Sequence, residues 1–137
     1  MRGNWQALTS HGRRTRETRR FVFALKFIED IVKKLHIAIS TDKIDQTVAD
    51  YSNRLGADPC LIIPGEYALW RTDSLNVSIR QDSSSNSGLL RHLGWEDAEA
   101  AEFTQDVDVN GIVWERFSAS HQAMEINELW PEVGYQP

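Results

Sequence analysis

The stretch that most restricts the fold is a strand that leads directly into a helix, residues 35–56. Its first six residues alternate between apolar and more polar side chains, and a period of two predicts a strand with one buried face. The apolar face consists of Leu35, Ile37 and Ile39. His36 and Ser40 then lie on the opposite face, so what that face binds is the functional question.

The helix is expected over residues 44–55, where apolar side chains recur at i, i+4, i+7 and i+11. Asp42 is the expected N-cap, and Gly56 is the expected end of the helix. An apolar helix face must be covered, so we expect this helix to pack on the apolar face of the strand.

Short β-prone runs bounded by turn residues follow the helix. Strands are expected over residues 60–63, 67–71 and 75–81. The first half of the chain therefore has the order β-α-β-β-β. Residues 82–88 contain no apolar side chain and predict a linker.

The second half is β-rich and ends in a helix. Strands are expected over residues 89–96, 103–109 and 112–117, and a helix over residues 119–130. Asn110-Gly111 predicts a hairpin with a type I′ turn, in which both residues have positive φ. Only a loop or a single helical turn fits residues 97–102. The fold class expected is α+β, with a cupped mixed sheet and helices outside it.

Charge divides the chain into two parts. Residues 1–34 contain nine Lys/Arg and three Asp/Glu, a net charge of +6, and the other 103 residues contain six and seventeen, a net charge of −11. We expect a basic, partly helical extension over residues 1–33 and one α+β domain over residues 34–137. The extension is either a solvated or self-associated tail or an adaptor for nucleic acid or protein. No aromatic interleaving accompanies its arginines, which disfavours nucleic acid.

Cysteine content and hydropathy exclude several protein classes. Cys60 is the only cysteine, so an internal disulfide and a paired-cysteine zinc or redox motif are excluded, and we expect a cytoplasmic location. No apolar run approaches the about 20 residues of a membrane span, so no membrane partner is expected.

Three short motifs carry a family resemblance. They are HIAI at residues 36–39, RLG at residues 54–56 and HLGWE at residues 92–96. Together with the β-α-β-β-β order, they resemble the vicinal oxygen chelate superfamily over residues 34–96. This superfamily includes glyoxalase I, bleomycin-resistance proteins and extradiol dioxygenases. The resemblance implies two βαβββ modules forming a cupped sheet around a ligand or divalent metal, although here the second module lacks its helix.

The resemblance also implies a set of metal ligands. Members take a His from each first strand and a carboxylate from the fourth strands, and His36 and His92 occupy the matching first-strand positions. Glu115 is the nearest strand carboxylate in the second half, with Glu128 as a weaker substitute. Two imidazoles and one carboxylate would suit Zn, Ni, Mn or Fe with open positions for substrate. The alternative is that both histidines only hydrogen-bond to their neighbours.

The remaining candidate residues concern a small-molecule ligand. Asn76, Ser78 and Arg80 alternate on the inward side of their strand, and a guanidinium there suits a carboxylate or phosphate. We also assign Trp95 to ligand binding, although large aromatic side chains in strands more often serve a core or a dimer interface.

Three functions remain open from the sequence. The first is a small-molecule-binding protein that acts as a metal-dependent lyase or isomerase, and the second is a protein that sequesters a ligand without chemistry. The third is an adaptor that binds nucleic acid or protein through the basic N-terminal extension. Four tryptophans in a body of 103 residues, together with open sheet edges, predict a homodimer with residues 89–96 or the last helix near the interface. A pocket shared by the two chains would combine His36 of one with His92 of the other.

Overall fold

The computed structural model describes residues 33–137, so the predictions made for residues 1–32 lie outside the described residues. The described elements are β1 (Lys34–Thr41), α2 (Ile44–Leu55), β2 (Leu61–Ile63), β3 (Tyr67–Arg71), β4 (Leu75–Gln81), the short 3-10 helix η1 (Ser84–Asn86), β5 (Leu90–Glu96), β6 (Thr104–Val107), β7 (Val113–Phe117) and α3 (Ala119–Leu129). The predicted α+β class and element order are confirmed. Neither α-helix in this part of the chain is long and apolar enough to cross a membrane.

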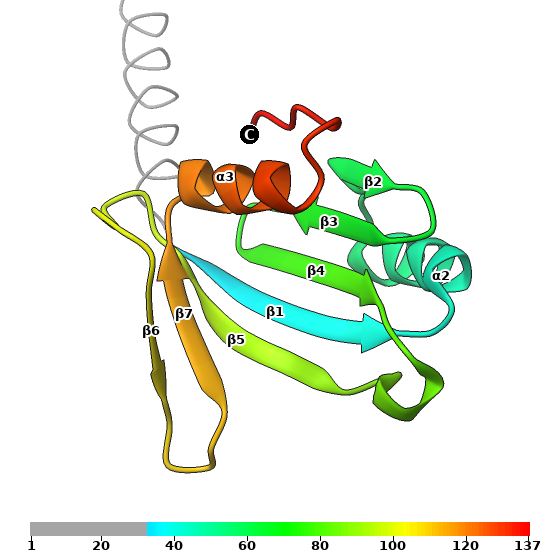
Figure 1. Ribbon diagram of the computed structural model, residues 1–137, viewed down its shortest axis with the longest axis horizontal. Helices are drawn as coiled ribbons and strands as arrows, with labels where there is room; N and C mark the ends of the chain where they lie inside the picture. The colour runs from blue at the N-terminus through cyan, green and yellow to red at the C-terminus, as the bar shows by residue number, and fades with distance from the viewer. Residues whose placement is uncertain (1–32) are drawn as a thin grey trace, which may run out of the picture. The chain divides into compact units, whose positions relative to one another are not determined.

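All seven strands belong to one mixed sheet, in the order β2-β3-β4-β1-β5-β7-β6 (Figure 1). The two halves of this sheet repeat one pattern. β4 is parallel to β1 and antiparallel to β3, just as β7 is parallel to β5 and antiparallel to β6. β1 and β5 pair antiparallel at the centre, with His36 opposite Gly94 and Ala38 opposite His92. An approximate twofold axis between these strands therefore relates His36 to His92.

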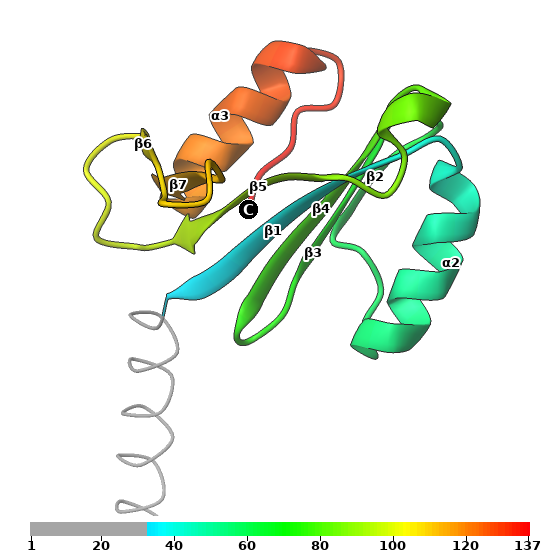
Figure 2. The ribbon, with the colours of Figure 1, turned by 90° about the horizontal axis from the view of Figure 1, so that it is seen from below.

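Helix α2 covers one face of the first half of the sheet (Figure 2). Ile44 forms a core with buried side chains of β3 and β4, and Ile39 packs against this core on the predicted face of β1. The prediction that this face is the buried one was wrong: Leu35, Ile37 and Ile39 are only half-buried, whereas the opposite face, with His36, Ala38 and Ser40, is buried. Gly56 ends the helix with a φ of 64°, also as predicted. Asp42 as the N-cap was wrong: Lys43 occupies that position without a side-chain cap, and the Asp42 carboxylate accepts a hydrogen bond from the Ser87 hydroxyl instead.

Helix α3 lies on the opposite face of the sheet, over the side that carries His36 (Figure 2). Ser118 caps its N-terminus by accepting a hydrogen bond from the backbone N–H of His121. Ile126 packs into a second core with Ile63, Tyr67 and Leu69. The two α-helices of the described region thus lie on opposite faces of the sheet (Figure 2).

The β6–β7 hairpin is present, but its turn differs from the prediction. Gly111 has a φ of 80°, whereas Asn110 does not have a positive φ, so a type I′ turn was wrong. The carboxylate of Asp108 accepts hydrogen bonds from the backbone N–H groups of Asn110 and Ile112 and from the indole of Trp114. One aspartate thus organises the whole loop.

Candidate metal centre

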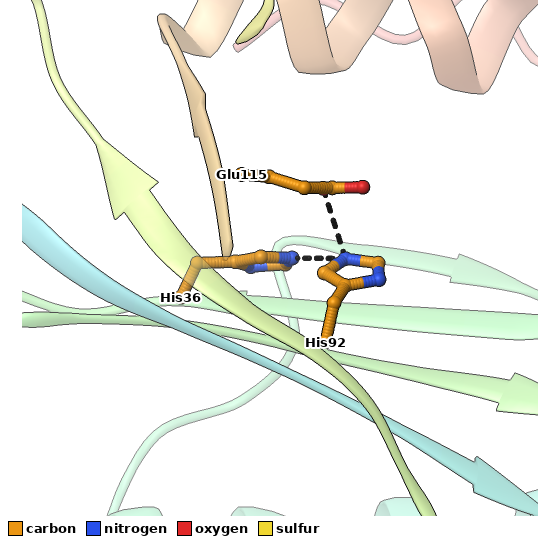
Figure 3. Close-up of side chains that lie close together, drawn as sticks. All are labelled: His36, His92 and Glu115. Atoms are coloured by element: carbon orange, nitrogen blue, oxygen red, sulfur yellow. Dashed lines mark hydrogen bonds and ion pairs between the residues drawn. The ribbon is translucent and has the colours of Figure 1, made fainter. Parts of the chain in front are cut away.

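Three potential metal ligands converge at the middle of the α3 side of the sheet (Figure 3). His36 comes from β1, His92 from β5 and Glu115 from β7. Nε2 of His36 lies 2.9 Å from Nε2 of His92, which lies 3.0 Å from Oε2 of Glu115. One donor atom from each residue lies within 4.8 Å of the others.

The register of the central strands explains this convergence. Side chains of a strand alternate between the two faces, and both His92 and His36 fall on the face that α3 covers. Gly94 lies directly opposite His36, two residues after His92 on β5, and pairs with Glu115 on β7. A Cβ atom at Gly94 would lie 2.4 Å from the backbone oxygen of Glu115, so glycine is required for β7 to lie this close.

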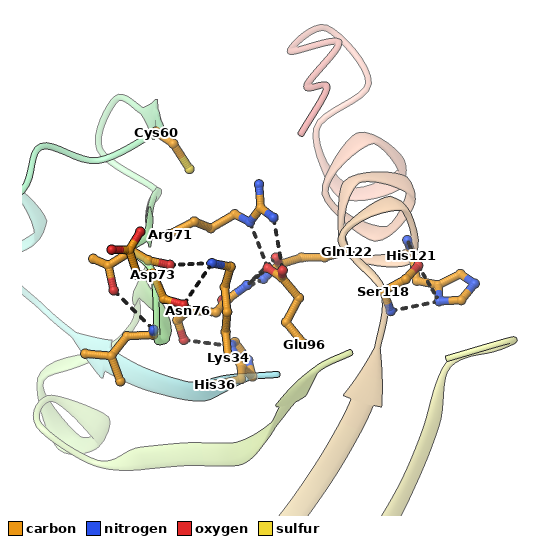
Figure 4. A network of polar contacts seen from close by, with 12 residues as sticks. Lys34, His36, Cys60, Arg71, Asp73, Asn76, Glu96, Ser118, His121 and Gln122 are labelled. Atoms are coloured by element: carbon orange, nitrogen blue, oxygen red, sulfur yellow. Dashed lines mark hydrogen bonds and ion pairs between the residues drawn. The ribbon is translucent and has the colours of Figure 1, made fainter. Parts of the chain in front are cut away.

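A chain of buried hydrogen bonds fixes how His36 presents its lone pair (Figure 4). The Glu96 carboxylate, held by the Arg71 guanidinium at 2.7 and 3.0 Å, can only accept hydrogen bonds. The Asn76 side chain must therefore turn its NH₂ group toward Glu96, at 2.9 Å. Its carbonyl oxygen then faces Nδ1 of His36 at 2.8 Å, so Nδ1 carries the proton. Nε2 of His36 consequently directs a lone pair into the centre.

The pKa values of the network agree with this assignment. Burial, reinforced by the neighbouring His92, lowers the pKa of His36, so the imidazole is neutral at pH 7. Burial alone would raise the pKa of Glu96, but the hydrogen bonds from Arg71 and Asn76 hold it below its usual value. The network therefore combines an ionised Glu96 with a neutral His36, the form in which histidine binds metals.

The centre contains more acceptors than protons. Nε2 of His36 offers a lone pair and the Glu115 carboxylate only accepts, so at most one proton, on Nε2 of His92, can serve both neighbours. One N–H cannot point well at two acceptors. A cation would satisfy all three groups at once. Around a tetrahedral Zn²⁺ with bonds of about 2.0–2.1 Å, ligand atoms lie about 3.3 Å apart, close to the two separations seen here.

A cavity opens beside the three ligands, between the sheet and α3. About 40 Å³ of it is accessible to a sphere the size of a water molecule. The side chains that line it include Ser78, Arg80, Arg91, Gln122 and Glu125. The approximate twofold relates Ser78 to Glu115, because Ser78 pairs with Ala38 as Glu115 pairs with Gly94. The first half of the chain thus places a hydroxyl where the second half places a carboxylate.

The other predicted ligand-binding residues take different positions. Arg80 and Ser78 line the cavity, as the strand alternation predicted. Asn76 is fully buried behind His36 and positions that side chain rather than meeting a ligand. Trp95 does not line the cavity; it lies on the other face of β5, where its ring is 6.5 Å from that of Trp114. His36 and His92 meet within one chain, so the three candidate ligands come together without a second chain.

Sequence patterns missed three polar cavity residues, Arg91, Gln122 and Glu125. Strict alternation in β5 would place Arg91 on the face away from His92, but a bulge changes its direction. Glu125 lies one position away from the apolar face predicted for the last helix. Gln122, Glu125 and Leu129 recur at helical spacing on the cavity side, and this pattern could have revealed it. Burial and the nearby Glu115 raise the pKa of Glu125.

Comparisons with known proteins add little to this geometry. No family model matches the chain, and no curated protein matches it. One solved structure, a hypothetical protein from Staphylococcus aureus, aligns with 63% of this chain and 34% of its own length, at 11% identity and a TM-score of 0.48. The chain therefore spans about a third of that protein. The function has to be argued from the site itself.

Proposed function

We propose that this chain is a small-molecule-binding protein whose His36, His92 and Glu115 hold a divalent metal, and that it acts as a metal-dependent lyase or isomerase. The observation that carries the proposal is the lone pair of His36, fixed by Asn76 and aimed at two further ligand atoms within 4.8 Å. Metal-ligating histidines typically have such a partner on the second ring nitrogen.

Three protein ligands would leave coordination positions for a substrate, the arrangement found in catalytic rather than structural sites. A bound Zn²⁺ or similar cation would supply Lewis acidity toward a carbonyl or enediolate oxygen. The chain's own groups would place that oxygen in the cavity, with Ser78 and Gln122 on its wall. Glu125, whose pKa is raised by burial and by the nearby Glu115, lines the same cavity and would exchange a proton with the substrate.

Metal binding is tested with protein purified without a His tag. We expect one equivalent of Zn²⁺ per chain by elemental analysis and a defined affinity in competition with a chelator. His92→Ala and Glu115→Gln should each weaken the affinity by more than the about 10- to 100-fold that loss of an outer partner costs. As matched controls, His121→Ala removes an imidazole and Glu128→Gln a carboxylate that lie outside the cluster. Both variants should bind Zn²⁺ with the affinity of the parent chain. Equal affinity in all four variants would refute the metal centre.

The alternative, a protein that sequesters a ligand without chemistry, would use the same cavity. Ligands that raise the melting temperature equally with and without metal would favour it. An adaptor that acts through the basic residues 1–33 stays a prediction; its binding should weaken with salt and disappear when these residues are deleted. We also propose a cytoplasmic location, which the free and exposed Cys60 supports.

A further inference from the structure

The β-bulge in β5 has a direct effect on the candidate site. Ala38 pairs with His92 and Ile39 pairs with Leu90, so Arg91 is an extra residue with no partner on β1. In a regular strand Arg91 and His92 would point to opposite faces, yet both line the cavity between the sheet and α3. Bulges are frequent beside active sites because they redirect a side chain in this way. The bulge thus places a guanidinium next to a candidate metal ligand.

A second guanidinium, that of Arg80, lines the same cavity. Its Cζ atom lies 5.6 Å from the centre of the Trp130 ring, a cation–π contact that holds its position. Both arginines are partly buried. Each raises the electrostatic potential at the other, and burial together with the Arg80 charge lowers the pKa of Arg91.

These two arginines differ from the others of the described region in their partners. Arg54, Arg71 and Arg116 each form an ion pair with an aspartate or glutamate. Within residues 33–137, neither Arg80 nor Arg91 has a carboxylate at ion-pair distance. The two guanidiniums share this small, partly desolvated cavity with the carboxylates of Glu115 and Glu125, which act on Arg91 from beyond ion-pair distance. A bound anion would give both guanidiniums the direct partner that no carboxylate of the described residues provides.

We infer that Arg91 and Arg80 form the anion subsite of the cavity and that the ligand is a small carboxylic acid with an oxygen on the neighbouring carbon, a 2-hydroxy or 2-oxo acid. The carboxylate lies against the two guanidiniums and the second oxygen faces His36, His92 and Glu115; this second attachment rests on the proposed metal-dependent function. About 40 Å³ of accessible space suits a ligand of a few heavy atoms rather than a nucleotide or a sugar phosphate.

The test uses glycolate, the smallest 2-hydroxy acid, with ethylene glycol as its uncharged counterpart and inorganic phosphate as a different anion. Binding is measured by calorimetry on the full chain with and without one equivalent of Zn²⁺. Arg91→Ala should weaken glycolate binding by about 10- to 100-fold, the loss expected for charge-assisted hydrogen bonds. Arg91→Lys keeps the charge and should lose less. Arg54→Ala removes an exposed arginine of α2 and should bind glycolate as the parent chain does.

The outcomes separate this inference from the proposed metal centre. The inference is wrong if glycolate does not bind, if Arg91→Ala and Arg54→Ala bind it equally, or if ethylene glycol binds as well as glycolate. Tighter, Arg91-dependent binding of phosphate would overturn the carboxylic acid assignment. If Zn²⁺ does not bind but glycolate binding still depends on Arg91, the metal centre fails while the anion subsite stands. An unchanged Zn²⁺ affinity of the Arg91→Ala variant shows that this variant is folded and that its three metal ligands are in place.

Discussion

Replacing Asn76 tests whether the buried network holds the candidate site together. Asn76 is fully buried and uses its whole side chain: the oxygen accepts from His36 and Gln122, and the NH₂ group donates to Glu96 and Gln122. Asn76→Ala leaves Nδ1 of His36 with the Asn76 backbone oxygen at 3.1 Å and leaves Glu96 with Arg71. Gln122 loses both of its hydrogen bonds in the network, because Asn76 is its partner in each.

The expected loss of stability follows from the hydrogen bonds that Asn76→Ala removes. An orphaned buried polar group costs about 1–3 kcal/mol, and Gln122 would have two, which water in the cavity can partly satisfy. We therefore expect Asn76→Ala to lower the free energy of unfolding by about 2–4 kcal/mol, measured by urea denaturation at pH 7. Asn86→Ala, an exposed asparagine in η1, is the matched control and should stay within about 0.5 kcal/mol.

A double variant makes the reasoning refutable. Removing both ends of a buried hydrogen bond costs less than removing one end, so Asn76→Leu combined with Gln122→Leu should lose less stability than the two single changes added together, by more than about 1 kcal/mol. The Zn²⁺ affinity of Asn76→Ala should also fall by about 10- to 100-fold, because the side-chain acceptor of His36 is gone. Strictly additive losses, or a single loss near that of Asn86→Ala, would refute the account of the network.

Three further predictions follow from the structure. Gly94→Ala places a Cβ atom 2.4 Å from the backbone oxygen of Glu115, which must move 0.6 Å to reach 3.0 Å. The free energy of unfolding, measured by urea denaturation, should fall by about 1–3 kcal/mol, and the variant should bind Zn²⁺ more weakly. Because the pKa of His36 is lowered from 6.5, the unfolded chain takes up a proton below pH 6.5 that the folded chain does not. The free energy of unfolding of the metal-free protein should therefore fall on acidification by up to about 1.4 kcal/mol per pH unit, and the fall should be less steep in His36→Gln. An equal slope in both proteins would contradict this. The edge strand β6 and Trp95 are exposed, which favours the homodimer. Sedimentation equilibrium at tens of micromolar should show a dimer, and Val107→Lys, a change on β6, should dissociate it. A monomeric parent chain would remove this proposal.

Period-two and helical patterns sufficed for much of the fold because each strand or helix has one face that must be buried. The alternation in residues 35–40 placed His36 away from α2, and the pattern of residues 44–55 identified the face of α2 that packs on the sheet. The Asp42 N-cap failed because the Ser87 hydroxyl, 45 residues away in sequence, binds that carboxylate instead. Such long-range competition leaves no local signal.

The candidate site was only partly predictable for the same reason. His36, His92 and Glu115 were candidates from strand positions, but their proximity depends on β5 and β7 pairing beside β1. Arg91 was missed because a one-residue bulge reverses the direction of a side chain, and the bulge is set by pairing across strands. The role of Asn76 as the partner of His36 depends on Glu96 and Arg71, which lie on two other strands.

Anomalous diffraction from crystals grown with one equivalent of Zn²⁺ tests the central claim most directly. We expect one strong peak at the zinc edge within about 2.0–2.2 Å of Nε2 of His36, Nε2 of His92 and a carboxylate oxygen of Glu115. We also expect Nδ1 of His36 to keep its contact with Asn76. A peak elsewhere, for example at His121, or no peak among these three side chains would contradict the account.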